Sequence, residues 1–361
     1  MKLGFGLYRR MLDDAHLQFA RQCGATHVIV HLCDYGDKGD RSAAQPTGDE
    51  NGWGIADHPG LWELEALLQI KRKIESHGLL WYGVENFDPA QWHDILLDGP
   101  LRDQQLEQAK AQIRIFGQLG LKAFGYNFSL SGVTGRASLT TRGGAETVGL
   151  DGINAMLLPP VPDGMVWNMR YRGGEAGVCL PEITEDTLWS RVGHFLRELA
   201  PVAEAAGVAL SAHPDDPPLS VVRRQPKLIY KPEYFQRLID LNPSPANQLE
   251  LCLGTLAEME GAGGEAFYRT VEELVRQKRV GYIHMRNVVG TVPHYTETFI
   301  DDGRIDVRRV FQILADHGYD GVIIPDHAPS MTAPGPWHAG MAFAMGYLKA
   351  NLQAALTDNN K

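Results

Sequence analysis

The strongest constraint on the fold of this chain is a regular alternation of short apolar segments with longer amphipathic ones. Eight segments rich in β-branched or aromatic residues recur along the sequence, and most are followed by a stretch with helical spacing. The predicted strands are 3–8, 27–32, 79–85, 123–128, 208–213, 248–253, 281–285 and 321–325. Eight strand–helix units in one chain predict an α/β fold, a single (β/α)8 (TIM) barrel.

The predicted helices support the same architecture. They cover 13–23, 61–76, 101–119, 185–206, 266–277 and 307–317, and a last helix over 337–356 follows the eighth strand. Glycines stand where five of these helices end, a position that favours the left-handed conformation: Gly24, Gly78, Gly120, Gly207 and Gly318. The alternative is a doubly wound open sheet, but no GxGxxG motif follows the first strand.

The length of the chain predicts insertions in that barrel. A barrel of this kind takes about 250 residues, whereas the chain has 361. We expect one domain over 1–361, with the surplus in the long segments 33–60 and 129–183. These follow the second and fourth predicted strands, so they should lie over the C-terminal face, where such barrels carry their active sites.

Composition excludes several classes of partner. The chain has 44 acidic and 34 basic residues, a formal charge of −10, and no Lys/Arg block, so nucleic acid is not an expected partner. No apolar run is long enough to cross a bilayer and no signal peptide is expected at the start. The four cysteines lack CxxC spacing, which favours a reducing, cytoplasmic setting over a disulfide framework: Cys23, Cys33, Cys179 and Cys252.

The last four predicted strands each end near a residue able to bind a metal. These residues are His213, Cys252, His284 and Asp326, each about one strand–helix unit from the next. A lone strand-end histidine or cysteine is more often structural, but four equivalent positions in neighbouring units favour a shared site. Two imidazoles, a thiolate and a carboxylate suit a divalent first-row metal, and zinc, manganese, iron and cobalt all remain open.

The same segments carry a resemblance to a known family. AHPDDPP (212–218), LCLGT (251–255), YIHMRNV (282–288), the acidic stretch 297–306 and PDH (325–327) resemble the mannonate dehydratases, metal-dependent barrels of the xylose-isomerase-like class. The resemblance implies a manganese ion, or iron(II) in its place, held by His213, Cys252, His284 and Asp326. It also implies dehydration of D-mannonate or a related sugar acid to a 2-keto-3-deoxy acid. Tyr126 and Asn127, which end the fourth strand, fit the pattern as substrate contacts.

Further roles follow from the reaction that this resemblance implies. A base must take a proton next to the carboxylate, and an acid must help the β-hydroxyl leave; the resemblance assigns this work to His327. Glu297 and Glu85 are further candidates for acid–base chemistry, for binding sugar hydroxyls or for orienting a ligand. Arg286, two residues beyond His284, could hold the substrate carboxylate with its planar fork or form a structural salt bridge. Asp215 and Asp216 lie in a turn stiffened by prolines, and either could accept the free N–H of a ligating histidine. A rigid, solvated turn is the alternative, and Asp215 is also a candidate contact of the substrate.

The chain also departs from the family pattern. Ala328 and Pro329 follow PDH in place of glycine and a polar residue, and the family's Asp-Trp after the fourth strand is replaced by 131–136. Where a catalytic tyrosine is expected, the chain reads PGPWH (334–338). Because an indole N–H does not usefully ionise, we expect Trp337 to contact substrate and His338 to take the catalytic role. His31, Asp34 and Asp37 replace an early histidine-rich segment.

The leading hypothesis is therefore a metal-dependent carbon–oxygen lyase that acts on a small sugar acid. A metal-dependent sugar isomerase or epimerase is the alternative, since enediol chemistry on a similar barrel needs the same metal and base. A non-catalytic barrel that binds a sugar acid or a metal is the third hypothesis. The sequence leaves open whether the chain forms a homo-oligomer.

Overall fold

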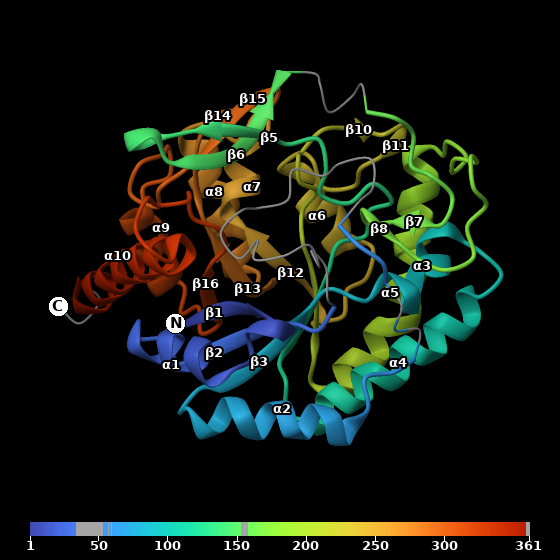
Figure 1. Cartoon of the computed structure of the whole chain (residues 1–361), viewed down its shortest axis with the longest axis horizontal. Helices are drawn as coiled ribbons and strands as arrows, with labels where there is room; N and C mark the ends of the chain where they lie inside the picture. The colour runs from blue at the N-terminus through green and yellow to red at the C-terminus, as the bar shows by residue number, and fades with distance from the viewer. Residues whose placement is uncertain (34–52, 57, 59, 153–157, 359–361) are drawn as a thin grey trace.

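The computed structural model describes residues 1–33, 53–56, 58, 60–152 and 158–358. Its centre is a closed barrel of eight parallel strands in the order β1-β16-β13-β12-β9-β4-β3-β2 (Figure 1). These strands are β1 (Lys2–Tyr8), β2 (His27–His31), β3 (Leu80–Glu85), β4 (Ala123–Tyr126), β9 (Ala209–Ala212), β12 (Asn247–Cys252), β13 (Val280–Met285) and β16 (Val322–Pro325). All eight predicted strands are barrel strands, so the predicted fold is confirmed.

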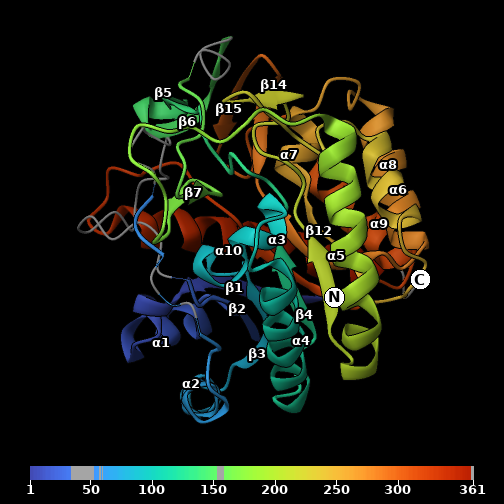
Figure 2. The ribbon, with the colours of Figure 1, turned by 90° about the vertical axis from the view of Figure 1, so that its right-hand side faces the viewer.

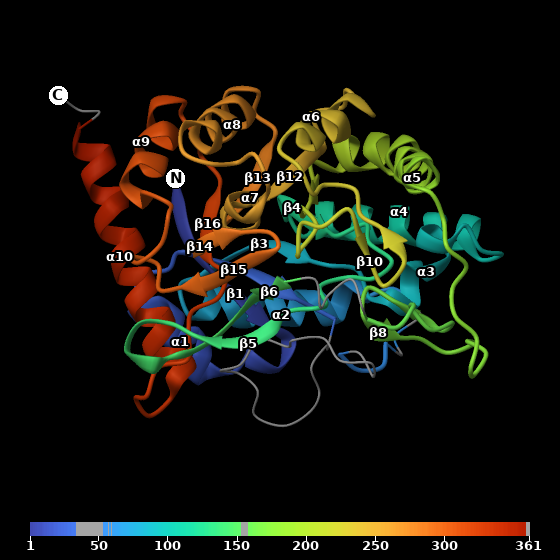
Figure 3. The ribbon, with the colours of Figure 1, turned by 90° about the horizontal axis from the view of Figure 1, so that it is seen from above.

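Helices surround this barrel. The seven predicted ones are α1 (Asp14–Gln22), α2 (Leu64–Ser76), α4 (Arg102–Gln118), α5 (Glu185–Ala206), α8 (Glu265–Arg276), α9 (Val307–Asp316) and α10 (Pro336–Asp358). The α4 and α5 helices lie side by side along one flank (Figure 2), and α10 packs along α9 (Figure 3). The five glycines that were expected to end helices all have positive φ, between 65° and 93°, as the left-handed C-cap requires.

Three short helices were not predicted. They are α3 (Pro89–Leu97), α6 (Glu233–Asp240) and α7 (Leu253–Glu258). Nearly every residue of α3 is buried, including His93 and Asp94, so it lacks the polar face that gives a helix its sequence period. The six-residue α7 follows β12 directly and is buried throughout, which makes it indistinguishable from the end of a buried strand by pattern alone.

A small antiparallel sheet covers part of the barrel's C-terminal end. It joins β5 (Ala137–Thr140) and β6 (Glu146–Asp151) of the second insertion to a hairpin after β13, formed by β14 (Asn287–Thr291) and β15 (His294–Thr298). The strand order is β14-β15-β6-β5, and the green and orange strands lie together in Figures 1 and 3. Two loops far apart in sequence are thus held together over the barrel mouth. We call these four strands the roof sheet.

The remaining strands are two short hairpins. They are β7 (Met165–Val166) with β8 (Met169–Arg170), also in the second insertion, and β10 (Val221–Val222) with β11 (Gln225–Pro226) after β9. Most of the first insertion, with Asp34 and Asp37, lies outside the described residues. The limits of a single domain over 1–361 therefore stay a prediction. None of the helices in the described ranges combines the length and apolar character that a membrane crossing requires.

Side chains fill the barrel lumen below its C-terminal end. Ile29, Ala123, Tyr282, Val322 and Ile324 form a separate buried cluster there, as the inward-facing layers of this fold do. Gly125 belongs to the same inner surface, because a Cβ at this position would overlap the Tyr282 phenol and the Glu250 carboxylate. The lumen is therefore a packed floor, and chemistry has to take place above it.

Candidate metal and catalytic site

Three predicted ligands meet above this floor. His213 directly follows β9, Cys252 ends β12, and His284 lies in β13, opposite Cys252 in the strand register. One donor atom from each of these residues lies within 4.8 Å of the other two. Neighbouring strands place them at one level, as their spacing in the sequence predicted.

Asp326 completes the group from β16. It follows the strand directly, and its carboxylate lies 3.5 Å from His284 Nδ1 and 3.8 Å from Cys252 Sγ. The backbone N–H and the hydroxyl of Thr255 face the same sulfur, at 3.4 and 3.2 Å. The structure thus brings three predicted ligands together and places the fourth, Asp326, beside two of them.

The charges around Cys252 favour its thiolate. Burial raises the pKa of the thiol, but Arg286 and hydrogen bonds from His213 and His284 outweigh it and lower the pKa to about 5. Burial likewise opposes ionisation of Asp326, yet His327 and His284 hold its pKa well below the usual range. Cys252 is therefore a thiolate and Asp326 a carboxylate. Both charged forms can bind a cation.

Each histidine presents one nitrogen to this cluster. His213 Nδ1 lies 2.6 Å from the Pro214 carbonyl oxygen, which can only accept, so Nδ1 carries the hydrogen and Nε2 is left as the donor atom. In His284 the Nε2 atom lies 3.0 Å from Glu250 and 3.2 Å from Glu85. His284 Nδ1 is buried, lies 3.5 Å from an Asp326 oxygen and faces the same cluster. This donor set fits a divalent first-row metal.

Glu250 and Glu85 orient His284 from below. Glu250 also accepts a 2.5 Å hydrogen bond from Tyr282, and Glu85 lies 3.4 Å from His31 Nε2. Burial, helped by the Glu85 charge, raises the pKa of Glu250 to about 8. Glu85, Glu250 and His284 could themselves be taken for a metal site, but Glu85 is hydrogen-bonded to His284 Nε2 and Glu250 to the Tyr282 hydroxyl, so each carboxylate has a partner within the protein. Sequence analysis missed Glu250, although its position two residues before Cys252 puts both on one strand face.

His327 is held beside this cluster. Its Nδ1 lies 2.8 Å from Glu297 and its Nε2 lies 3.0 Å from Asp326. Burial lowers the pKa of His327, but these two carboxylates outweigh burial and raise it to about 9. Glu297, from β15 in the roof sheet, is therefore placed to fix the ring of His327 rather than to act alone.

Arg286 corrects one prediction. Its side chain is 2% exposed, and it donates to Glu297 at 2.7 Å, to Asp216 at 2.8 Å and to Thr255 Oγ1 at 2.9 Å. Glu258 lies 3.1 Å from the same guanidinium. Protein carboxylates thus occupy the planar fork that was expected to hold the substrate, and the structural salt bridge is the role that the contacts support.

Tyr126 corrects a second prediction. Because Gly125 faces the lumen, the side chain of the next residue in the strand points outward. The Tyr126 ring packs 4.9 Å from Phe195 of α5, in the apolar layer between strands and helices. Tyr126 therefore belongs to the core and makes no wall of the site. Asn127, one residue further, donates through Nδ2 to the backbone carbonyls of His213 and Pro214 at 3.4 and 3.3 Å, so it holds the turn that carries His213.

Asp215 has a structural role instead of the predicted contact with substrate. Its Oδ2 accepts from the backbone N–H groups of Leu228 and Ile229 at 2.8 and 2.9 Å, and its Oδ1 lies 3.3 Å from Lys227 Nζ. A buried carboxylate with these partners ties the segment after β11 to the turn after β9. Its neighbour Asp216 is the one that contacts Arg286.

Trp337 and His338 also correct their predicted roles. Both open α10 and pack against α1: the Trp337 ring lies 5.7 Å and the His338 ring 4.7 Å from Phe19. Trp337 also lies 6.2 Å from Phe5, which faces outward from β1 between the inward-facing Gly4 and Gly6. These contacts assign the two rings to the layer between α1, α10 and β1, and not to the metal cluster.

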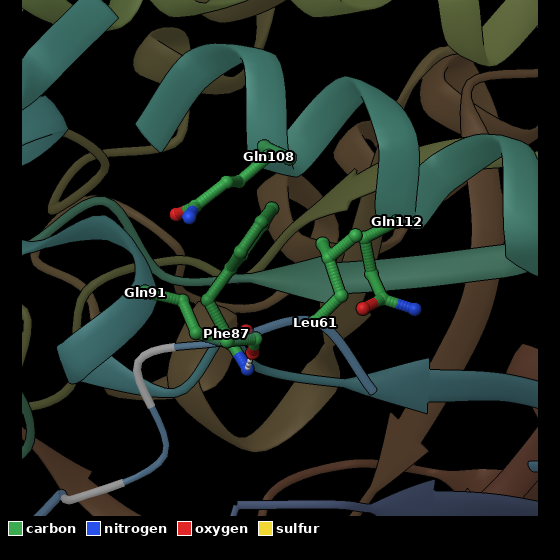
Figure 4. A pocket seen from close by; sticks show the side chains of 7 residues that line it. Leu61, Phe87, Gln91, Gln108 and Gln112 are labelled. Carbon is green, nitrogen blue, oxygen red and sulfur yellow. Dashed lines mark hydrogen bonds between the residues drawn. The ribbon is translucent and has the colours of Figure 1, made fainter. Parts of the chain in front are cut away.

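A small pocket elsewhere has no part in this site. Figure 4 shows it between α4 and the turn before α2, with Gln91, Gln108 and Gln112 around it. Gln91 donates to the Gly60 carbonyl at 2.8 Å, and Gln112 accepts from the Trp62 N–H at 2.8 Å. Its polar groups therefore hold the chain that leads into α2, and the cluster of metal-binding residues remains the candidate site.

Comparison with known proteins agrees with this geometry. The family model described as D-mannonate dehydratase matches residues 1–157 and 178–358. The chain belongs to the D-mannonate dehydratase family. The resemblance seen in the sequence is thereby confirmed, and the chain is a dehydratase, a carbon–oxygen lyase of a metal-dependent family. Membership favours this class over the isomerase alternative.

Individual members of the D-mannonate dehydratase family support the assignment. The mannonate dehydratase of Streptococcus equi subsp. zooepidemicus is 29% identical over 314 residues, which cover 81% of this chain and 85% of that protein. The mannonate dehydratase of Thermotoga neapolitana is 30% identical over 294 residues, covering 74% and 78%.

Solved structures confirm the fold. The crystal structure of mannonate dehydratase from Streptococcus suis serotype 2 matches with a TM-score of 0.77 and 22% identity, over 100% of this chain and 96% of that one. An L-ribulose 3-epimerase matches with a TM-score of 0.54 and 14% identity, over 99% and 97%. At these identities the matches show the barrel alone.

The second insertion contributes to the site of this family member. Arg136, which precedes β5, is buried and reaches 3.4 Å from Glu297 and 3.9 Å from Asp216. Tyr295 of β15 donates to Asp216 at 3.2 Å. Sequence analysis missed these partners, because only the pairing of β6 with β15 brings the insertion to the loop after β13.

Proposed function

We propose that this chain dehydrates D-mannonate or a related sugar acid to the 2-keto-3-deoxy acid. The observation that carries the proposal is the cluster of His213, Cys252 and His284, with Asp326 3.5 Å from His284 and 3.8 Å from Cys252, and with His327 3.0 Å from Asp326. Membership of the family supports the substrate class. The mannonate dehydratases that match at about 30% identity take their name from the same substrate.

A divalent first-row metal is part of the proposal, with Mn²⁺ as the first choice and Fe²⁺ as the second. His213, Cys252, His284 and Asp326 would hold it. Such a cation supplies a Lewis acid that stabilises negative charge developing next to the substrate carboxylate. The choice of Mn²⁺ follows the family resemblance, since the donor set itself also suits other first-row ions.

The chain's own residues serve proton transfer. The reaction removes the C2 proton and the C3 hydroxyl, so a group must take a proton close to the carboxylate. The family resemblance assigns this role to His327, which lies beside the proposed ligands with Nδ1 held by Glu297 and Nε2 facing Asp326. It can take a proton only in the state in which Nε2 carries none. Glu297 is in turn fixed by Arg286. A bound sugar acid would lie above the packed lumen and below the roof sheet.

An anaerobic assay tests the proposal. Purified protein with added Mn²⁺ is incubated with a panel of aldonates and ketoses, and products are identified by mass and NMR. Formation of a 2-keto-3-deoxy acid from D-mannonate or a close stereoisomer is the expected result. Interconversion of aldose and ketose without loss of water would favour the isomerase alternative. No turnover of any compound, with metal bound, would favour the non-catalytic barrel.

The cellular setting and assembly are proposals too. Cys252 has to stay a thiolate to bind the metal, so we place the protein in a reducing compartment, the cytoplasm. Light scattering of the same preparation would show whether it is a homo-oligomer, which the sequence left open.

A further inference from the structure

Thr255 contacts the sulfur of a proposed ligand through two groups. Its backbone N–H lies 3.4 Å from Cys252 Sγ, and its hydroxyl oxygen lies 3.2 Å from the same sulfur. Both residues are fully buried. A cysteine binds a metal as its thiolate, which has no hydrogen to give, so in the metal-binding state both hydrogen bonds must be donated by Thr255.

The contact with the backbone N–H follows from the place where the strand stops. β12 ends at Cys252 and α7 begins at the next residue, so Cys252 precedes the first turn of the helix. Its side chain accepts from the N–H three residues later, which is the geometry in which short side chains cap a helix. This bond restrains rotation about the Cα–Cβ bond of Cys252, and so holds the sulfur at the end of the strand.

Arg286 decides which way the hydroxyl of Thr255 points. A threonine hydroxyl has one hydrogen and two lone pairs, and the hydrogen turns toward an available acceptor. Arg286 Nη2 lies 2.9 Å from Thr255 Oγ1, and a guanidinium can only donate. The oxygen of Thr255 therefore accepts from Arg286, and its own hydrogen is left for Cys252 Sγ.

The arginine has little freedom to turn away from this hydroxyl. Its side chain is buried, and its guanidinium also donates to Glu297 at 2.7 Å and to Asp216 at 2.8 Å. Gly254 lets the arginine lie against the first turn of α7, because a Cβ at this position would overlap Arg286 Cγ and Nε. A fixed series of contacts thus leads from the roof sheet through Arg286 to the sulfur.

Hydrogen bonds to a ligating sulfur matter for the metal that it binds. A thiolate donates charge to a cation through its lone pairs, and an N–H or O–H that points at the sulfur draws on the same electrons. Donors that are themselves held by buried contacts also fix the position of a ligand before the cation arrives. Thr255 meets both conditions, because its N–H belongs to a helix and its hydroxyl is oriented by Arg286.

We propose that Thr255 is a positioning residue for the metal centre. It holds Cys252 Sγ in place, and its hydroxyl, aimed by Arg286, limits the charge that the sulfur gives to a bound first-row cation. Thr255 acts through Cys252 and lies outside the proposed ligand set. This inference rests on the proposed function, because it concerns the cation that the proposed dehydration needs.

The test titrates the purified protein with Co²⁺, without substrate, and follows the thiolate-to-cobalt absorption band. Thr255→Val replaces the hydroxyl with a methyl group of similar size. Because the sulfur lone pairs lie at higher energy without the O–H···S bond, the band at saturating Co²⁺ should move to longer wavelength. The Kd for Co²⁺ should rise about 10-fold or more, as is typical when a partner of a ligand is removed. Thr255→Ser keeps the hydroxyl and should restore both values.

Thr270→Val is the matched control. The Thr270 hydroxyl donates to the Ala266 carbonyl at 3.0 Å within α8, so this substitution removes a hydrogen-bonded hydroxyl without touching the sulfur. Its band and its Kd should stay as in wild type. Thr255→Ala and Thr255→Ser differ by one oxygen atom and give the same comparison if valine prevents folding. An unmoved band in the variants that lack the hydroxyl, or a shift that serine does not reverse, would overturn the proposal.

Two further outcomes separate this inference from the proposed function. If the wild-type protein shows the band but dehydrates no sugar acid, the proposed dehydration has failed, and the comparison of the Thr255 variants still decides the role of Thr255. If the wild-type protein binds Co²⁺ without a thiolate-to-cobalt band, Cys252 is not a ligand and the role of Thr255 is overturned.

Discussion

Cys252 shows at the scale of one residue how neighbouring charges set the chemistry of a side chain. Buried thiols ordinarily keep their proton, yet Arg286, His213 and His284 lower the pKa of Cys252 to about 5. The arginine does this without touching substrate, because Asp216 and Glu297 hold it in place. An arginine that seemed suited to the substrate therefore favours the thiolate of a proposed metal ligand.

We predict that Cys252→Ser loses the metal. A serine hydroxyl stays protonated at neutral pH and is a much weaker ligand than a thiolate. Metal content after dialysis, measured by plasma mass spectrometry, should fall from near one equivalent to a small fraction, and Mn²⁺ should no longer raise Tm. Cys179→Ser is the control, since Cys179 is exposed. Full metal content in Cys252→Ser would remove this residue from the ligand set.

We predict that Glu297→Gln lowers kcat about 10- to 100-fold while metal content stays near wild type, in line with losses seen when the partner of a functional group is removed. The amide keeps one acceptor for His327 but loses the charge that pairs with Arg286. Because the Glu297 carboxylate raises the pKa of His327, its removal lowers that pKa. The limb of the pH–rate profile that His327 controls should move to lower pH. An unmoved limb would argue against Glu297 as a positioning residue.

At the scale of elements, the sequence predicts where a residue lies along a strand better than it predicts which way its side chain points. Eight strands could be found because buried parallel strands are short apolar runs separated by helices. The position of the four proposed ligands could be predicted because each stands at or near a strand end, and the barrel topology brings neighbouring strand ends together. Tyr126 could not be placed, because one residue decides whether a side chain enters the lumen or the core. Arg286 could not, because its partners Asp216 and Glu297 come from other loops.

The roof sheet brings the second insertion to the candidate site, where Arg136 contacts Asp216 and Glu297. The negative charges of Asp216 and Glu297 face the guanidiniums of Arg136 and Arg286. Burial raises the pKa of both carboxyls, but the two guanidiniums outweigh burial and hold the pKa of each below the usual range. Glu258 also lies 3.1 Å from Arg286, and burial raises the pKa of this carboxyl well above its usual value. Arg136 and Arg286 therefore lie among buried carboxylates, with Asp216 and Glu297 in reach of both.

We predict that Arg136→Met destabilises the protein by about 3–5 kcal/mol, as expected when one partner of a buried ion pair is removed. The measurement is urea unfolding followed by fluorescence and circular dichroism. Arg142→Met is the control, because Arg142 pairs with Asp301 at the exposed end of the same insertion, and exposed pairs contribute about 0–1 kcal/mol. Equal stability of the two variants would contradict the charge balance proposed for the interior.

For the molecule as a whole, net charge opposes the chemistry. A chain with a formal charge of −10 repels an anionic sugar acid at long range, although salt screens that field beyond about 10 Å. Arg286 lies beside the proposed ligands, but its guanidinium is already paired with the carboxylates of Glu297 and Asp216. Attraction for the substrate anion must then come from local positive charge at the mouth, and a bound cation is the strongest source of it.

The same cation should hold half of the barrel together. Its proposed ligands come from β9, β12, β13 and β16, which are consecutive in the barrel, so binding requires that these four strands be folded. A ligand that binds only the folded state at 100 times its Kd adds about 2.7 kcal/mol to the unfolding free energy. We predict that removing the metal with a chelator lowers Tm by several degrees and that Mn²⁺ restores it. The rise in Tm should grow with the ratio of free Mn²⁺ to the Kd measured by calorimetry. Mg²⁺ should restore much less, because it prefers oxygen ligands. A Tm that ignores both chelator and Mn²⁺ would mean that these strands bind no metal.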